Sequence, residues 1–67
     1  MRNTTKLKLV LQLYTVSLDM DEDGNLQMTL TKKRNGEEQT FLHKNYSAIV
    51  GQAFVFMNKQ IKKDIIN

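Results

Sequence analysis

Three groups of residues have types and spacings that could carry chemistry, and the first is Asp19-x-Asp21-x-Asp23-Gly24. This run matches the first half of an EF-hand calcium loop, in which carboxylates alternate before a turn glycine. The position that should supply a bidentate glutamate is Leu30, and the flanking residues predict strands rather than helices. Because Asp and Gly are also common turn formers, we expect a solvated acidic turn and no metal site.

The second group is His43, the single imidazole of the chain. A catalytic histidine needs a hydroxyl or carboxylate within hydrogen-bond reach, and the candidate hydroxyls are those of Ser17 and Ser47. Most carboxylates lie in the distant acidic turn, and one histidine does not make a histidine-based metal site. We therefore expect His43 to pack or cap, and we predict no catalytic residues, no cofactor and no enzymatic activity.

The third group is basic and suits phosphate contacts. It forms two clusters, Lys32, Lys33 and Arg34 in one and Lys59, Lys62 and Lys63 in the other. Single-stranded nucleic acid also needs exposed aromatic rings, and Tyr14 is the one ring left free to stack. The alternative is a set of lysines that keeps the surface solvated. Nucleic-acid binding by a polar sheet face and these clusters is therefore our second functional hypothesis.

Two apolar alternations, at residues 16–20 and 26–30, predict strands that each have one apolar face. A three-residue turn at 22–24 is the length that aligns these faces, and it places Gly24 where a left-handed residue is needed. The predicted pairs are Met20 with Leu26, Leu18 with Met28 and Val16 with Leu30.

Asn35-Gly36 predicts a second hairpin, because a two-residue type I′ turn needs positive φ at both positions. The predicted pairs are Leu30 with Phe41, Thr31 with Thr40, Lys33 with Glu38 and Arg34 with Glu37. The strand after this turn thus adds Phe41 to the apolar face.

Residues 6–13 alternate as well, with leucine at each odd position from Leu7 to Leu13. This phase is opposite to that of the next strand, so the pattern predicts either one strand bulged near Tyr14 or two separate strands. Val10 interrupts the polar face, which indicates that the strand is covered on both sides.

From Tyr46 onward the apolar spacing becomes helical, with Asn45 as the N-cap. Gly51 in this helix predicts a close approach to the sheet. The stripe consists of Tyr46, Ile49, Val50, Ala53, Phe54, Met57, Ile61 and Ile65. We therefore predict a single α+β domain over residues 1–67, an antiparallel meander of three to four strands followed by one long helix packed on one sheet face.

This helix and the N-terminal segment carry more apolar side chains than one sheet face can cover. Large exposed apolar patches mark interfaces. The surplus predicts a protein partner and a homodimer, formed through the helices or through an exposed sheet edge, with a candidate interface at Val55, Phe56, Ile61, Ile65 and Ile66. Our first functional hypothesis is thus a small non-enzymatic interaction or regulatory module.

The amino-acid composition excludes several classes of protein. The chain has 67 residues, no Cys, Pro or Trp, and a net charge of +3. A cysteine-free chain excludes disulfide scaffolds, thiolate zinc sites and iron–sulfur clusters. Because no apolar stretch reaches the length of a membrane span and no signal-peptide pattern is present, we expect a cytoplasmic protein. Its size and its Lys, Asn and Ile usage are typical of small proteins of AT-rich phages or mobile elements.

Overall fold

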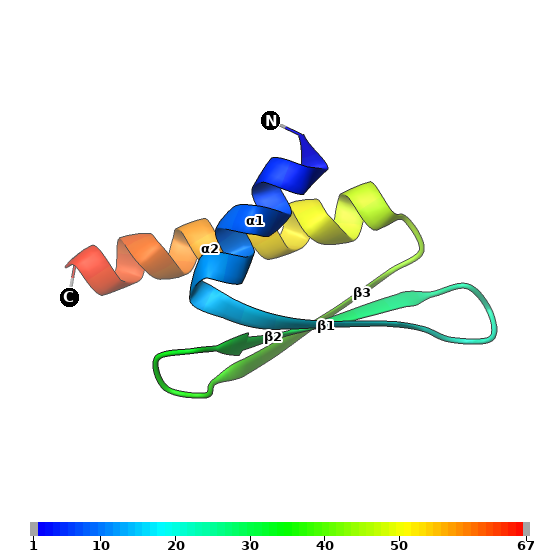
Figure 1. Ribbon diagram of the computed structural model, residues 1–67, viewed down its shortest axis with the longest axis horizontal. Coiled ribbons are helices and arrows are strands. Elements are labelled where there is room, and N and C mark those ends of the chain that lie inside the picture. Colours follow the sequence, from blue (N-terminus) through cyan, green and yellow to red (C-terminus); the bar gives the residue numbers. More distant parts are fainter. Residues whose placement is uncertain (1, 67) are drawn as a thin grey trace.

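The computed structural model describes residues 2–66, in which two helices and a three-stranded meander form the fold (Figure 1). In chain order the elements are α1 (Asn3–Leu13), β1 (Tyr14–Met20), β2 (Leu26–Lys32), β3 (Glu38–His43) and α2 (Tyr46–Ile66). The strands are antiparallel in the order β1-β2-β3, and both helices lie on the same face of the sheet. The predicted α+β class, with a meander followed by a long C-terminal helix, is confirmed.

The N-terminal segment is a helix, so the prediction of a bulged or split strand over residues 6–13 is wrong. Leu, Lys and Gln, which dominate this segment, are strong helix formers. The Val10 side chain is fully buried in the core on the inner side of α1. Its burial explains why an apolar residue interrupts the otherwise polar face of the expected strand. The change of phase near Tyr14 is the helix-to-strand boundary, where the Tyr14 backbone N–H donates to the Val10 carbonyl.

The first hairpin has the predicted register. Met20 pairs with Leu26, Leu18 with Met28 and Val16 with Leu30. Gly24 has φ of 84°, the left-handed conformation that the turn requires. The face rule, by which the apolar residues of paired strands must lie on one face, was decisive here. A register one residue away would have placed a polar residue opposite an apolar one.

The second hairpin is shifted by two residues from the predicted register, so the type I′ turn and the pairs of Lys33 with Glu38 and Arg34 with Glu37 are wrong. Met28, not Leu30, pairs with Phe41, and Thr29 pairs with Thr40. The Lys32 N–H donates to the Glu37 carbonyl, so that four residues form the loop, and of these only Gly36 has positive φ, at 78°. A shift of two leaves every side chain on its predicted face, which is why Phe41 still faces the helices.

Helix α2 begins after Asn45, whose Oδ1 accepts the Ala48 backbone N–H at 3.0 Å, as expected of an N-cap. The core consists of Val10, Tyr14, Met28, Leu30, Ile49, Val50, Ala53 and Met57. Gly51 does not mark a close approach to the sheet, because a Cβ built there would meet nothing within 4 Å. Neither helix of the described residues is long and apolar enough to cross a membrane.

Candidate interaction surface

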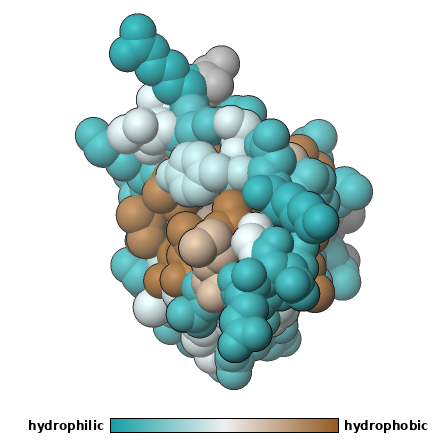
Figure 2. Space-filling view, turned by 90° about the vertical axis from the view of Figure 1, so that its right-hand side faces the viewer, coloured by the Kyte–Doolittle hydropathy of each residue, from teal (hydrophilic) through white to brown (hydrophobic). Residues whose placement is uncertain are grey.

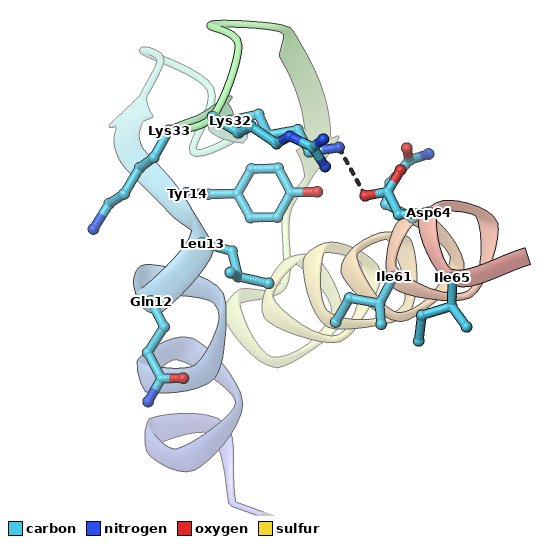
Figure 3. Close-up of a pocket in the computed structure, with 10 residues that line it drawn as sticks. Gln12, Leu13, Tyr14, Lys32, Lys33, Ile61, Asp64 and Ile65 are labelled. Carbon is cyan, nitrogen blue, oxygen red and sulfur yellow. Dashed lines mark hydrogen bonds and ion pairs between the residues drawn. The ribbon is translucent and has the colours of Figure 1, made fainter. Parts of the chain in front are cut away.

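The end of the molecule that holds the β2–β3 turn and the last turns of α2 contains an apolar pocket of about 350 Å³ (Figure 3). Its apolar lining comes from three elements, namely Leu13 of α1, Tyr14 of β1, and Ile61 and Ile65 of α2. Leu13 is 44% exposed and Ile65 is 78% exposed, so the pocket is open to solvent. The polar residues that complete it are Gln12, Lys32, Lys33, Arg34, Gln60 and Asp64. We call this set the C-terminal pocket.

One ion pair crosses the C-terminal pocket. Lys32 Nζ donates to Asp64 Oδ2 at 3.1 Å and ties the end of β2 to α2, and the Tyr14 hydroxyl is directed toward this pair (Figure 3). Burial raises the pKa of Tyr14, an effect that Lys32 opposes and Asp64 reinforces. The pair neutralises Asp64, which leaves Lys33 and Arg34 to give this pocket a positive rim.

A second hollow of about 570 Å³ lies on the side of α2 that carries Gly51. Gly51 lines this hollow together with Phe54 and Val55, and a Cβ built on Gly51 would meet nothing within 4 Å. Lys6 of α1 reaches the same place, with its Nζ 5.9 Å from the centroid of the Phe54 ring, a cation–π geometry. The residues that line this outer groove are Lys6, Phe41, Gly51, Gln52, Phe54, Val55, Phe56 and Lys59.

The five residues of the predicted helix interface do not form one surface. Val55 is exposed in the outer groove, whereas Ile61 and Ile65 line the C-terminal pocket. Phe56 is partly buried and packs against Tyr14 and Phe41, with ring centroids 6.2 and 5.6 Å away. The side chain of Ile66 lies outside the described residues.

The six basic residues of the nucleic-acid hypothesis are also spread over several surfaces. Lys33 and Arg34 line the C-terminal pocket, where the ammonium of Lys32 is already paired with Asp64. Lys59 lines the outer groove, and Lys62 is exposed on the last turns of α2. Lys63 shares a smaller pocket with Glu37 and Glu38. Tyr14, the expected base-stacking residue, is only 3% exposed and belongs to the core.

The acidic motif forms the β1–β2 turn. Asp21 Oδ1 accepts the backbone N–H groups of Asp23 and Asn25, each at 2.9 Å, and Oδ2 accepts from the Asn25 side chain. These hydrogen bonds favour the ionised form and lower the pKa of Asp21. In residues 2–66 no three carboxylate or imidazole groups come together in a way that could hold a metal ion.

His43 lies at the end of β3, where its Nδ1 accepts the Asn45 backbone N–H at 3.0 Å. This contact helps to form the turn that leads into α2. His43 is exposed and lines a shallow hollow with Asp21, Asn25, Leu42 and Lys44. The expectation of a histidine that takes part in capping agrees with this geometry.

Two features of the surface were not foreseen from the sequence. Leu13 joins the C-terminal pocket because residues 3–13 are helical, and Val10 carried the signal that could have indicated this. On β1, Leu18 and Met20 belong to the apolar face yet are 43% and 69% exposed, because the helices do not reach that end of the strand.

Comparison of the chain with protein-family models, with curated protein sequences and with solved structures finds no match in any of the three.

Proposed function

We propose that this chain is a non-enzymatic interaction module that self-associates and acts by binding another protein. The observation that carries the proposal is the C-terminal pocket, an open apolar surface built from three elements and rimmed by cations. Its volume of about 350 Å³ is within the range of sites that take up a large side chain or a small molecule.

The chemistry of this pocket favours one kind of partner segment. Leu13, Ile61 and Ile65 offer an apolar floor, while Lys33 and Arg34 supply unneutralised positive charge at the rim. A protein segment that presents an apolar side chain next to carboxylates matches both properties. The absence of cysteine is consistent with action in the cytoplasm, where we place this function.

Nucleic-acid binding is the second candidate. The outer sheet face supports it, since it carries hydroxyl side chains such as those of Thr29 and Thr40, which lie 3.2 Å apart. Lys33 and Arg34 stand at one end of this sheet. The other end carries the acidic turn, which repels phosphates, so we rank this function below protein binding.

The test is affinity capture from an extract of the cells that express the chain, with and without nuclease. The wild-type chain is compared with Ile65→Glu in the C-terminal pocket and with the matched control Leu42→Glu, since Leu42 is 66% exposed on the opposite face of the sheet. We expect one protein that is retained after nuclease by wild type and by the control and is lost with Ile65→Glu. Equal capture by the wild-type chain and both variants would refute binding through the C-terminal pocket. Loss of capture on nuclease treatment would favour a nucleic-acid partner.

A further inference from the structure

Strand β1 lies at the edge of the sheet and has a free row of backbone hydrogen-bonding groups. The Lys33 N–H donates to the Leu13 carbonyl, and antiparallel pairing alternates from there, so the odd-numbered residues of β1 bond to β2. The N–H and C=O groups of Val16, Leu18 and Met20 therefore point away from the sheet. Within residues 2–66 no other hydrogen bond reaches these groups.

This edge lacks the features that usually protect an edge strand. Proteins block such edges with proline, with a bulge or with charged side chains, above all lysine; β1 has no proline, lysine or bulge over Tyr14–Met20, and Asp19 is its one charged residue. Every residue from 17 to 20 is exposed. Figure 2 looks at the end of the molecule toward which the β1–β2 turn points, and it shows apolar side chains gathered in the middle of that end.

We propose that two copies of this chain pair through their β1 edges, antiparallel and with the two-fold axis at Leu18. Leu18 then faces Leu18 of the partner subunit, and Val16 faces Met20 of the partner subunit. Each such pair exchanges two backbone hydrogen bonds, so every free N–H and C=O of Val16, Leu18 and Met20 is used. The two sheets become one six-stranded sheet.

The side chains agree with this register. Residues directly opposite one another share a face, so the apolar side chains of both copies lie on the same face of the joined sheet, the one on which the helices lie. On the other face Ser17 lies opposite Asp19 of the partner subunit, which avoids a like-charge pair and allows a hydroxyl to donate to a carboxylate. An isologous interface of this kind needs self-complementarity, which this strand has about Leu18.

Charge indicates that the occupant of this edge is a second copy. Asp19, Asp21, Glu22 and Asp23 make one end of the hairpin acidic. The other end carries Lys33, which lies across from Leu13, and Arg34, whereas Lys32 at the same end is already paired with Asp64. Antiparallel pairing about Leu18 brings the acidic turn of each copy beside the basic end of the partner, twice. The acidic and basic groups are about two strand spacings apart, roughly 10 Å. This distance is close to the Debye length at moderate salt, so their attraction is only partly screened.

This interface deepens the self-association part of the proposed function and rests on it. Since the chain has no cysteine, a single introduced thiol reports one position. In the proposed pair the Leu18 Cα atoms lie about 5.5 Å apart, within the range that a disulfide spans. The variants are Leu18→Cys, and Val55→Cys and Ile65→Cys as matched exposed positions on α2. Light scattering gives the mass of the wild-type chain, and oxidation followed by non-reducing electrophoresis gives the cross-linking.

We expect wild type at twice the 7.8 kDa of one chain, rapid cross-linking of Leu18→Cys, and at least tenfold slower cross-linking at both α2 positions. A dimer that cross-links at Val55 or Ile65 but not at Leu18 would overturn the β1 interface while leaving self-association intact. A monomeric wild type would overturn both.

A second pair of variants tests the backbone contribution. Leu18→Pro removes an N–H that points away from β2, whereas Leu18→Ala removes the same side chain and keeps the N–H. We expect both to keep the circular dichroism spectrum of wild type, the Pro variant to be monomeric, and the Ala variant to dimerise more weakly than wild type. Equal dissociation constants for the two variants would contradict backbone pairing at this residue.

Discussion

Lys32, the last residue of β2, and Asp64, in the last turns of α2, form an ion pair with 3.1 Å between Nζ and Oδ2. The two residues are 32 positions apart, and the pair holds the C-terminal part of α2 against the end of the sheet. It also removes one cation from the basic cluster at Lys32, Lys33 and Arg34 and leaves the other two on the rim of the C-terminal pocket.

We expect a double-mutant cycle over this pair to give a modest coupling. With Lys32→Met, Asp64→Asn and the double variant, the coupling free energy should be about 0.5–1 kcal/mol, because the Asp64 carboxylate is partly exposed and screened. Urea unfolding at low salt and at about 0.5 M salt measures it. The coupling should fall at the higher salt, and a coupling of zero at low salt would show that the pair does not stabilise α2.

Burial of Val10 gives the second prediction. Val10→Ala should lower the free energy of unfolding by about 2 kcal/mol, since the side chain is fully buried between α1 and the core. Leu11→Ala is the matched control, because Leu11 is the next residue of α1 and is 43% exposed. Chemical denaturation of both variants should separate them by at least about 1 kcal/mol. Similar losses would argue against a helix that turns Val10 inward and Leu11 outward.

The wrong prediction for the segment that forms α1 and the correct prediction for β1 both relied on an alternating apolar pattern. Alternating leucines at positions 7–13 satisfy a strand pattern, but leucine has no preference for strands and is a strong helix former. In β1 and β2 the alternating positions are shared with Thr and Val, and the face rule selected one register. The second hairpin escaped that rule, because a shift of two residues changes no face and both registers satisfy it equally.

The surfaces were only partly predictable for another reason. The sequence shows which residues are basic or apolar, and Ile61 and Ile65 were named as members of an interface. The arrangement of distant segments, such as Leu13 and the last turns of α2 around one pocket or Lys32 beside Asp64, depends on how α1 and α2 cross the sheet. No local period encodes that crossing.

The third prediction concerns pH. The pKa of Tyr14 is raised by burial, so the folded state favours the neutral phenol. This contribution to stability is fully present below pH 10, the ordinary pKa, and is lost as pH rises through the higher pKa of the folded state. We expect the free energy of unfolding of wild type to fall more steeply above pH 10 than that of Tyr14→Phe. The control is Tyr46→Phe, at an exposed ring, and it should follow wild type.

Gly51 and Gly36 make the last prediction, because alanine should have opposite effects at the two glycines. Gly51→Ala should raise the free energy of unfolding by about 0.5–1 kcal/mol, since Gly51 lies inside α2 and an added Cβ meets nothing within 4 Å. Gly36→Ala should lower it by about 1 kcal/mol, because φ of 78° is unfavourable for a residue with a Cβ. Thermal and urea unfolding measure both.

If Gly51→Ala stabilises the fold, stability does not explain the glycine at this position. Its role would then lie in the outer groove, which Gly51 lines together with Phe54 and Val55. The added methyl group would fill part of that hollow. A variant that is more stable yet captures the partner less well would extend the binding surface from the C-terminal pocket to the outer groove. Unchanged capture would confine binding to the C-terminal pocket. A loss of stability would contradict the open space beside Gly51, because it would mean that the added methyl group meets other atoms.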